Sequence, residues 1–270
     1  MFSTETIAAL AVGVALAVLI PVIAVIMFKK KNPDSWLPSV FIGASTFIVF
    51  ALILEQILHT VMIPILKDNI IIYSVYGALA AGVFEETGRF VAYKTLMKKH
   101  YTTKNAVLMG LGHGGIEAII ALGVTLAMLL VLAVMSNSIG IDKVLEMTAS
   151  GNPGTAEALK NPLETQLEGL TEYNFVSCAL GVYERIVAMI LHTCMSVFVY
   201  KAVTQKGKIW LYPTAILLHA LFDFPAALYQ TNVITSISVI YIIMTVFTAI
   251  IAGAAVLMAK KMPDNGEKQR

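Results

Sequence analysis

The sequence predicts an all-α polytopic membrane protein with about seven transmembrane helices. Of its 270 residues, 58% are hydrophobic and only 13% are charged. A soluble domain of this length carries about 25% charged residues. Long apolar runs recur along the whole chain, and the few basic residues gather at alternate connections between the runs. These observations together predict a membrane-spanning helical bundle.

Seven runs of about 20 or more mostly apolar residues are long enough to cross a hydrocarbon core about 30 Å thick. They are residues 5–28, 37–66, 70–97, 105–136, 173–203, 209–230 and 232–259. The second run is long enough to be tilted or broken, and Pro64 near its end favours a break. The connections are short except for residues 137–172, in which we expect one or two short surface helices. We expect residues 1–270 to form one integral-membrane domain.

Lys and Arg residues set the expected orientation, since they favour cytoplasmic connections. They cluster at Lys29–Lys31, Lys94–Lys104, Lys201–Lys208 and Lys260–Arg270, whereas the 137–172 loop is acidic. The N-terminus is therefore expected outside and the C-terminus in the cytoplasm. The first run lacks a preceding basic segment, so it is expected to be an uncleaved first span. We expect a multi-pass protein of the cell membrane, specifically a bacterial cytoplasmic membrane.

Other features exclude several classes of function. The basic residues flank spans in small groups, which does not indicate nucleic-acid binding. The two cysteines, Cys178 and Cys194, fall in one apolar run without metal-type spacing. They are expected to be packing residues rather than a disulfide framework.

Ionisable residues inside the spans are the strongest functional signal, because each unpaired charge costs at least about 2.5–3.5 kcal/mol in a membrane helix. Four of the seven runs carry nearly all of them, mostly at helical spacing on one face. The twelve residues are Glu55, His59, Glu85, Glu86, Arg89, His113, Glu117, Glu184, Arg185, His192, His219 and Asp223.

Four of these residues are expected at a similar depth in the bilayer. At about 1.5 Å per residue from the cytoplasmic ends of the runs, His113, His192, His219 and Glu86 all lie roughly 12–17 Å deep. Imidazole and carboxylate are the usual ligands of catalytic zinc. A glutamate beside a zinc-activated water can act as general base. The pattern therefore predicts a metal or activated-water site assembled across four helices.

Two other interpretations stay open. Buried His–Glu and Glu–Arg pairs can simply tie helices together, and this is the expected role of Glu55 and His59 near the outer end of their span. A transporter or proton relay also uses intramembrane histidines and carboxylates. The chain shows no inverted repeat, and seven spans do not divide into equal halves.

The motifs resemble those of the YhfC family of membrane peptidases, which is itself similar to PrsW-type proteases and to the CAAX-protease (CPBP) superfamily. The resemblance covers about residues 76–223. The matching motifs are Glu85-Glu86-x-x-Arg89, His113-x-x-x-Glu117, Glu184-Arg185 with His192, and His219-x-x-x-Asp223. Compared with CAAX proteases, the glutamate pair lies one residue closer to the arginine. His113 stands at the Phe position of the second motif, and Glu117 at its His position.

The resemblance implies an intramembrane metal-dependent endopeptidase in which Glu85 or Glu86 activates water and zinc is the expected cofactor. The implied catalytic residues are Glu85, Glu86, Arg89, Glu117 and Arg185, and the implied metal ligands are His113, His192, His219, Asp223 and Glu184. The expected substrate is a membrane-embedded or lipid-modified protein or peptide. A non-enzymatic transporter or immunity-type binding protein is the alternative. The family's motif order slightly favours Glu85 as the base.

Overall fold

The computed structural model describes residues 1–148, 165–262 and 264, and over these residues the chain is helical with no strand. Seven helical stretches are long and apolar enough to cross a membrane, which confirms the predicted fold class. They span Thr4–Lys31, Pro38–Leu66, Ile70–Lys94, Thr103–Ile139, Phe175–Thr204, Leu211–Gln230 and Ile237–Lys261. Each agrees with a predicted run to within about five residues at either end.

The chain divides into two compact units. The first comprises Met1–Ile20 and Ala118–Arg185, and the second comprises Pro21–Glu117 and Ile186–Arg270. Two of the long helices, α1 (Thr4–Lys31) and α9 (Phe175–Thr204), contribute to both units.

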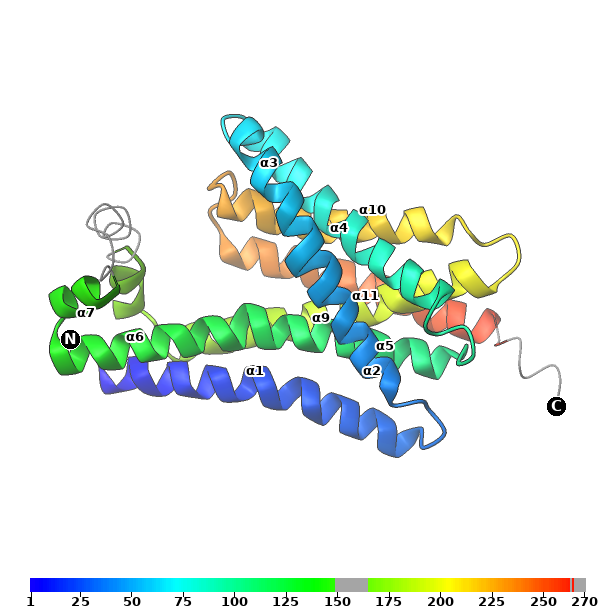
Figure 1. Ribbon diagram of the computed structural model, residues 1–270, viewed down its shortest axis with the longest axis horizontal. Helices are drawn as coiled ribbons and strands as arrows, with labels where there is room; N and C mark the ends of the chain where they lie inside the picture. The colour runs from blue at the N-terminus through cyan, green and yellow to red at the C-terminus, as the bar shows by residue number, and fades with distance from the viewer. Residues whose placement is uncertain (149–164, 263, 265–270) are drawn as a thin grey trace. The chain divides into compact units, whose positions relative to one another are not determined.

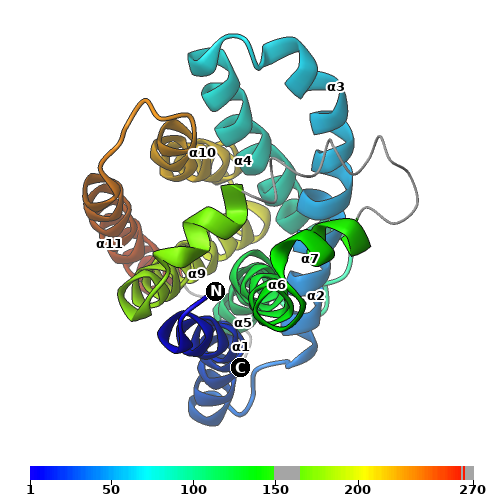
Figure 2. The same ribbon diagram turned by 90° about the vertical axis from the view of Figure 1, so that its left-hand side faces the viewer.

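In the second unit, α4 (Ile70–Lys94) lies along α10 (Leu211–Gln230) (Figure 1). The two helices approach closely at Gly82, where an added Cβ would lie 2.6 Å from the carbonyl oxygen of Ile216. The last helix, α11 (Ile237–Lys261), packs beside α10 (Figures 1 and 2). Apolar side chains from α4, α9, α10 and α11 form one core cluster.

The second span consists of α2 (Pro38–Thr46), a π-helical segment η1 (Phe47–Glu55) and α3 (Gln56–Leu66). Pro64 lies inside α3 without interrupting it, so the break predicted near this proline is wrong. The irregularity lies instead at η1, which packs along α4. In η1 the buried side chains recur every four residues, at Phe47, Ala51 and Glu55. This segment therefore turns Glu55 toward the interior.

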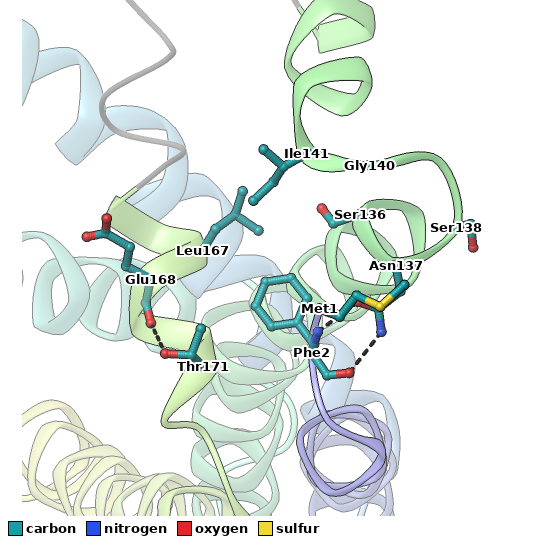
Figure 3. Close-up of a pocket in the computed structure, with 10 residues that line it drawn as sticks. All are labelled: Met1, Phe2, Ser136, Asn137, Ser138, Gly140, Ile141, Leu167, Glu168 and Thr171. Atoms are coloured by element: carbon teal, nitrogen blue, oxygen red, sulfur yellow. Dashed lines mark hydrogen bonds between the residues drawn. The ribbon is translucent and has the colours of Figure 1, made fainter.

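The fourth span is built in the same way, from α5 (Thr103–Ala118), the π-helical η2 (Ile119–Val124) and α6 (Thr125–Ile139). In the first unit, α6 lies beside the N-terminal part of α1 (Figure 1). The side-chain amide of Asn137 donates to the carbonyl of Phe2 and accepts from its N–H, beside the pocket shown in Figure 3. The long loop contains α7 (Ile141–Thr148) and a helical turn at residues 165–171, as expected. Residues 149–164 of the loop lie outside the described residues.

The end of α11 is attached to the second unit by a buried ion pair. Lys201 is fully buried and donates to Asp264, Thr103 and the carbonyl of Met262. Burial opposes ionisation of Asp264. Hydrogen bonds from the backbone and hydroxyl of Thr103, and then from Lys201 and Tyr200, nevertheless hold the pKa of this carboxyl below its usual value of 3.8.

Candidate metal centre

Four helices of the second unit place eight ionisable side chains together. Residues 85, 86 and 89 lie on α4, residues 113 and 117 on α5, residue 192 on α9, and residues 219 and 223 on α10. Six of the eight are buried, while the side chains of Glu117 and Asp223 are 15% and 32% exposed. The eight residues are Glu85, Glu86, Arg89, His113, Glu117, His192, His219 and Asp223.

Glycines on α5 allow the helices that carry these side chains to approach closely. An added Cβ at Gly112 would lie 2.0 Å from the carbonyl oxygen of Val40 on α2. An added Cβ at Gly110 would lie 2.5 Å from the Cα of Thr193 on α9. Small residues at helix interfaces permit such backbone contact. These two contacts fix the distances at which α2 and α9 present their side chains to α5.

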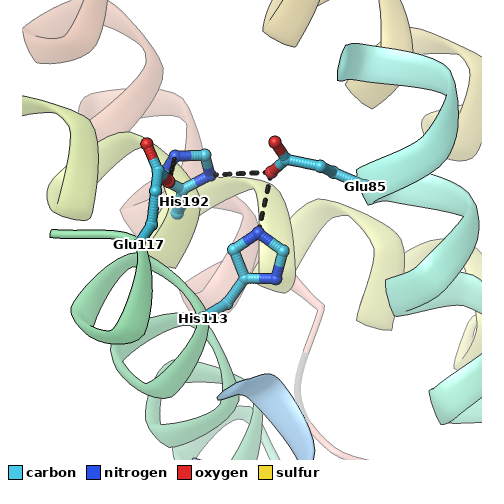
Figure 4. A group of neighbouring side chains, drawn as sticks. All are labelled: Glu85, His113, Glu117 and His192. Carbon is cyan, nitrogen blue, oxygen red and sulfur yellow. Dashed lines mark hydrogen bonds and ion pairs between the residues drawn. The ribbon is translucent and has the colours of Figure 1, made fainter. Parts of the chain in front are cut away.

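The carboxylate of Glu85 is the centre of the cluster. Its Oε2 lies 2.7 Å from Nε2 of His113, 3.6 Å from Nδ1 of His192 and 3.8 Å from Nε2 of His219. Figure 4 shows His113 and His192 directed toward this oxygen from different helices. The ring centroids of His113 and His192 are 5.1 Å apart, as are those of His192 and His219. Three imidazoles and one carboxylate oxygen therefore converge on one small volume.

The proton on His113 can be assigned from its hydrogen bonds. Thr46 donates its hydroxyl hydrogen to the carbonyl of Gly43, at 2.6 Å. The same hydroxyl oxygen lies 3.0 Å from Nδ1 of His113 and must accept there. Nδ1 therefore carries a hydrogen, which leaves the Nε2 lone pair of the neutral ring facing Glu85 at 2.7 Å. Two acceptors at this distance need a proton or a cation between them.

His192 is held from two sides. Arg89 can only donate, and its Nη2 lies 2.9 Å from Nδ1 of His192. Nε2 on the other side of the ring lies 2.5 Å from Oε2 of Glu117, in a contact whose geometry is not that of a hydrogen bond. The ring of His192 therefore lies between a guanidinium and a carboxylate.

Glu86 lies on the same helix as Glu85 but has different partners. Its Oε1 accepts from Nη1 of Arg89 and lies 2.7 Å from Nδ1 of His219. Among the described residues its Oε2 has no hydrogen-bond partner. The guanidinium keeps Glu86 ionised, so His219 donates from Nδ1 and turns Nε2 toward Asp223, 3.3 Å away. Arg89 also lies 3.7 Å from Glu85.

Sequence comparison agrees with this arrangement. The profile of the YhfC intramembrane metalloprotease family matches residues 16–244, a range that includes all eight residues of the cluster. The chain belongs to the YhfC intramembrane metalloprotease family. It is similar to the membrane protein YhfC of Bacillus subtilis (strain 168), with 35% identity over 256 residues that cover 93% of this chain and 95% of the relative. No solved structure matches the chain.

The cluster fits the metal that the name of the YhfC family implies. Donor atoms of Glu85, His113, Glu117 and His192 all lie within 4.8 Å of one another. Imidazole nitrogen and carboxylate oxygen are ligands of zinc and of other divalent transition metals. The bond from Nδ1 of His113 to the hydroxyl oxygen of Thr46 is the kind of support that fixes a ligating histidine. The donor set is therefore suited to a divalent cation.

The charge of the cluster also favours a bound cation. Within the eight residues, four carboxylates accompany one guanidinium. Carboxylates buried away from water must be paired, protonated or bound to a metal. A divalent cation bound here would balance part of the negative charge of the carboxylates.

Two residues that the sequence associates with the site are not among the eight residues of the second unit. Glu184 and Arg185 belong to the first unit, where the guanidinium of Arg185 contacts the carboxylate of Glu184. Conversely, Thr46 contacts His113 directly although the sequence does not distinguish it. A lone hydroxyl in an apolar run gives no signal, because such groups commonly bond to their own helix.

Proposed function

We propose that this protein is an intramembrane metallopeptidase that hydrolyses a peptide bond with a water molecule activated by Glu85. The observation that carries the proposal is the contact between Glu85 and His113, in which Thr46 fixes the histidine tautomer so that a lone pair faces the carboxylate. Two helices can be tied together without a histidine that is held in one tautomer. A histidine that binds a metal, in contrast, is held in one tautomer by a second hydrogen bond.

We assign the metal to His113, His192 and Glu117, with zinc as the expected ion. Two histidines and one glutamate form an established ligand set for catalytic zinc and leave a position open. A divalent metal there would act as a Lewis acid toward a carbonyl group and would acidify water. His219 and Asp223, which the sequence also suggests as ligands, are assigned to positioning because His219 is bound by Glu86.

In the proposed mechanism, each side chain of the cluster has a separate role in hydrolysis. Oε2 of Glu85 accepts a proton from the attacking water and returns it to the leaving nitrogen, since it is within reach of three imidazoles and its contact with Arg89, at 3.7 Å, is longer than that of Glu86. Glu86 holds Arg89 and His219 in place. Arg89 orients His192 through Nδ1. Asp223, the most exposed member, lies where the substrate can contact it.

The proposed substrate is a membrane-embedded or lipid-modified protein or peptide, because the cluster lies within apolar spans. We also propose that the N-terminus is outside and the C-terminus in the cytoplasm of a bacterial cell membrane. The charge distribution at the connections supports this orientation.

Metal analysis and substrate trapping test the proposal. Purified protein should contain about one zinc per chain, and His113→Gln and His192→Gln should lose it. The control His100→Gln changes a histidine that stacks on Trp36 outside the cluster and should keep it. Zinc-loaded protein should cleave fluorescein-labelled casein in detergent, and Glu85→Gln should keep zinc while retaining uncleaved membrane proteins as crosslinked partners. Zinc-free protein with chelator-insensitive turnover would refute the metal assignment.

A further inference from the structure

Two hydrogen bonds join α4 to α9 one helical turn apart. Nη2 of Arg89 lies 2.9 Å from Nδ1 of His192, and the hydroxyl of Tyr93 lies 2.7 Å from the hydroxyl of Ser196. Both pairs are 103 residues apart in the chain, so the two helices run in the same direction here. Residues four apart lie on the same face of a helix. The position of Ser196 against Tyr93 is therefore linked to the position of His192 against Arg89.

The hydroxyl pair is fully enclosed. Tyr93 and Ser196 are both 0% exposed. The ring of Tyr93 also lies beside that of Tyr200, one turn further along α9, with ring centroids 5.7 Å apart. A buried hydroxyl must find a partner inside the protein, and here each hydroxyl is bonded to the other. A slide of one helix along the other would break this bond inside the core.

The face of α5 that meets α9 at the same level contains glycine. An added Cβ at Gly110 would lie 3.0 Å from the Cβ of Ser196, and one at Gly114 would lie 2.9 Å from the Cα of Met189. Small residues let helices approach closely, but a glycine carries no side chain that interlocks with the facing helix. The contact with α5 therefore sets how close α9 lies, whereas the directed bond between hydroxyls sets its height against α4.

We propose that Tyr93 and Ser196 are positioning residues of the metal centre, and that their hydroxyl pair holds His192 at the height where Arg89 engages Nδ1. Functional sites require side chains placed to within about 0.5 Å by packing and supporting hydrogen bonds. This inference rests on the proposed function, because it takes His192 as a metal ligand. Tyr93 and Ser196 act through His192 and are not catalytic residues.

The test compares the same change at two tyrosines of α4. Tyr93→Phe removes the hydroxyl that meets Ser196 on α9. Tyr76→Phe removes a hydroxyl that lies 2.7 Å from Nδ1 of His59 on α3. Zinc affinity is measured by competition with a chelator on full-length protein in detergent, below the melting temperature of each variant. We expect Tyr93→Phe to bind zinc about 10-fold more weakly or worse, and Tyr76→Phe to bind it as the wild type does.

A double variant separates positioning from stability. Tyr93→Phe alone leaves the buried hydroxyl of Ser196 without its partner, which should lower the melting temperature. Combining Tyr93→Phe with Ser196→Ala removes both polar groups and should recover part of that loss. Zinc affinity should stay low in the double variant, because no directed bond remains at this level. Cobalt(II) at saturation, in place of zinc, should show an altered visible absorption spectrum in both Tyr93 variants and an unaltered one in Tyr76→Phe.

The outcomes distinguish this inference from the function on which it rests. Wild-type zinc affinity in the double variant would refute the positioning role, whatever its melting temperature. An equal loss of zinc affinity in Tyr76→Phe would also refute it, since that hydroxyl does not contact α9. A wild type that binds no zinc would overturn the metal assignment of the proposed function together with this inference.

Discussion

The two adjacent glutamates should respond very differently to the same isosteric change. Glu86 is fully buried, and its Oε1 is bound by Arg89 and lies 2.7 Å from His219. Glu85 lies at the centre of the imidazoles and is 3.7 Å from Arg89. Glu86→Gln therefore removes the ionised partner of a buried cation. Glu85→Gln leaves that pair in place.

The expected size of each effect follows from these contacts. Arg89 is fully buried, and removing one partner of a buried ion pair costs about 3–5 kcal/mol of unfolding free energy. In Glu85→Gln the new amide can donate to the Nε2 lone pair of His113, so a hydrogen bond is kept and the excess negative charge falls. We expect a stability change within about 1 kcal/mol for that variant.

Turnover should be more sensitive to the change at Glu85, whereas stability should be more sensitive to the change at Glu86. Loss of a general base typically lowers turnover about 10²–10⁴-fold, so Glu85→Gln should lose activity while it keeps its zinc and its melting temperature. The assay measures thermal unfolding in detergent, zinc per chain and casein turnover on the same samples. Glu168→Gln is the control, because it changes an exposed carboxylate in the other unit.

Two results would refute this reasoning. If Glu85→Gln kept full turnover on a verified substrate, the glutamate-base mechanism would be wrong. If Glu86→Gln unfolded at the wild-type temperature, Arg89 would not depend on Glu86, and the division between a structural and a catalytic glutamate would fail.

Four further predictions concern the rest of the molecule. Zinc binding should weaken as the pH falls and should release protons, because ligating histidines and carboxylates must lose any proton that they hold before they bind the ion; calorimetry in two buffers measures this, and pH-independent binding would contradict it. Gly112→Ala should destabilise the protein by about 1–3 kcal/mol and weaken zinc binding, whereas Gly77→Ala, with no atom within 4 Å of the added Cβ, should do neither in the same melting and zinc assays. In a cysteine-free background, a cysteine at Gln166 should react with an impermeant thiol reagent in intact cells and one at Lys206 only after lysis; the reverse pattern would invert the topology. The lowered pKa of Asp264 means that its contribution to stability is present above its usual value of 3.8 and is lost as the pH falls below it, so Asp264→Asn should lower the melting temperature at pH 7 but much less at pH 3.

The spans could be predicted from sequence because a membrane helix must be about 20 apolar residues long, whatever it packs against. The interruption of the second span could not be located in this way. Pro64 suggested a break, but a proline near a helix end removes few backbone hydrogen bonds, and α3 continues through it. The π-helical η1 consists of apolar residues with no proline or glycine. It is determined by packing against other helices, which the local sequence does not record.

Helical spacing and depth also predicted which side chains share a level, but not how each helix is rotated. Glu85 and Glu86 are adjacent on one helix, so their side chains point in different directions. In the structure Glu85 faces the imidazoles and Glu86 binds Arg89, yet Glu86 also contacts His219. The pairing of Glu117 with His192 depends on the relative rotation of α5 and α9, so no pattern within either helix could show it.

The charge of the cluster explains why these side chains are placed together at all. A bundle that needed only helix ties would match each carboxylate with a cation, as the end of α11 does with Lys201 and Asp264. The eight residues of the metal cluster instead include four carboxylates and one guanidinium, and Thr46 and Arg89 each engage Nδ1 of one histidine, His113 and His192 respectively. Protons and a metal ion would compete for the same carboxylate and imidazole atoms. This competition is the physical basis for expecting metal binding here to depend on pH.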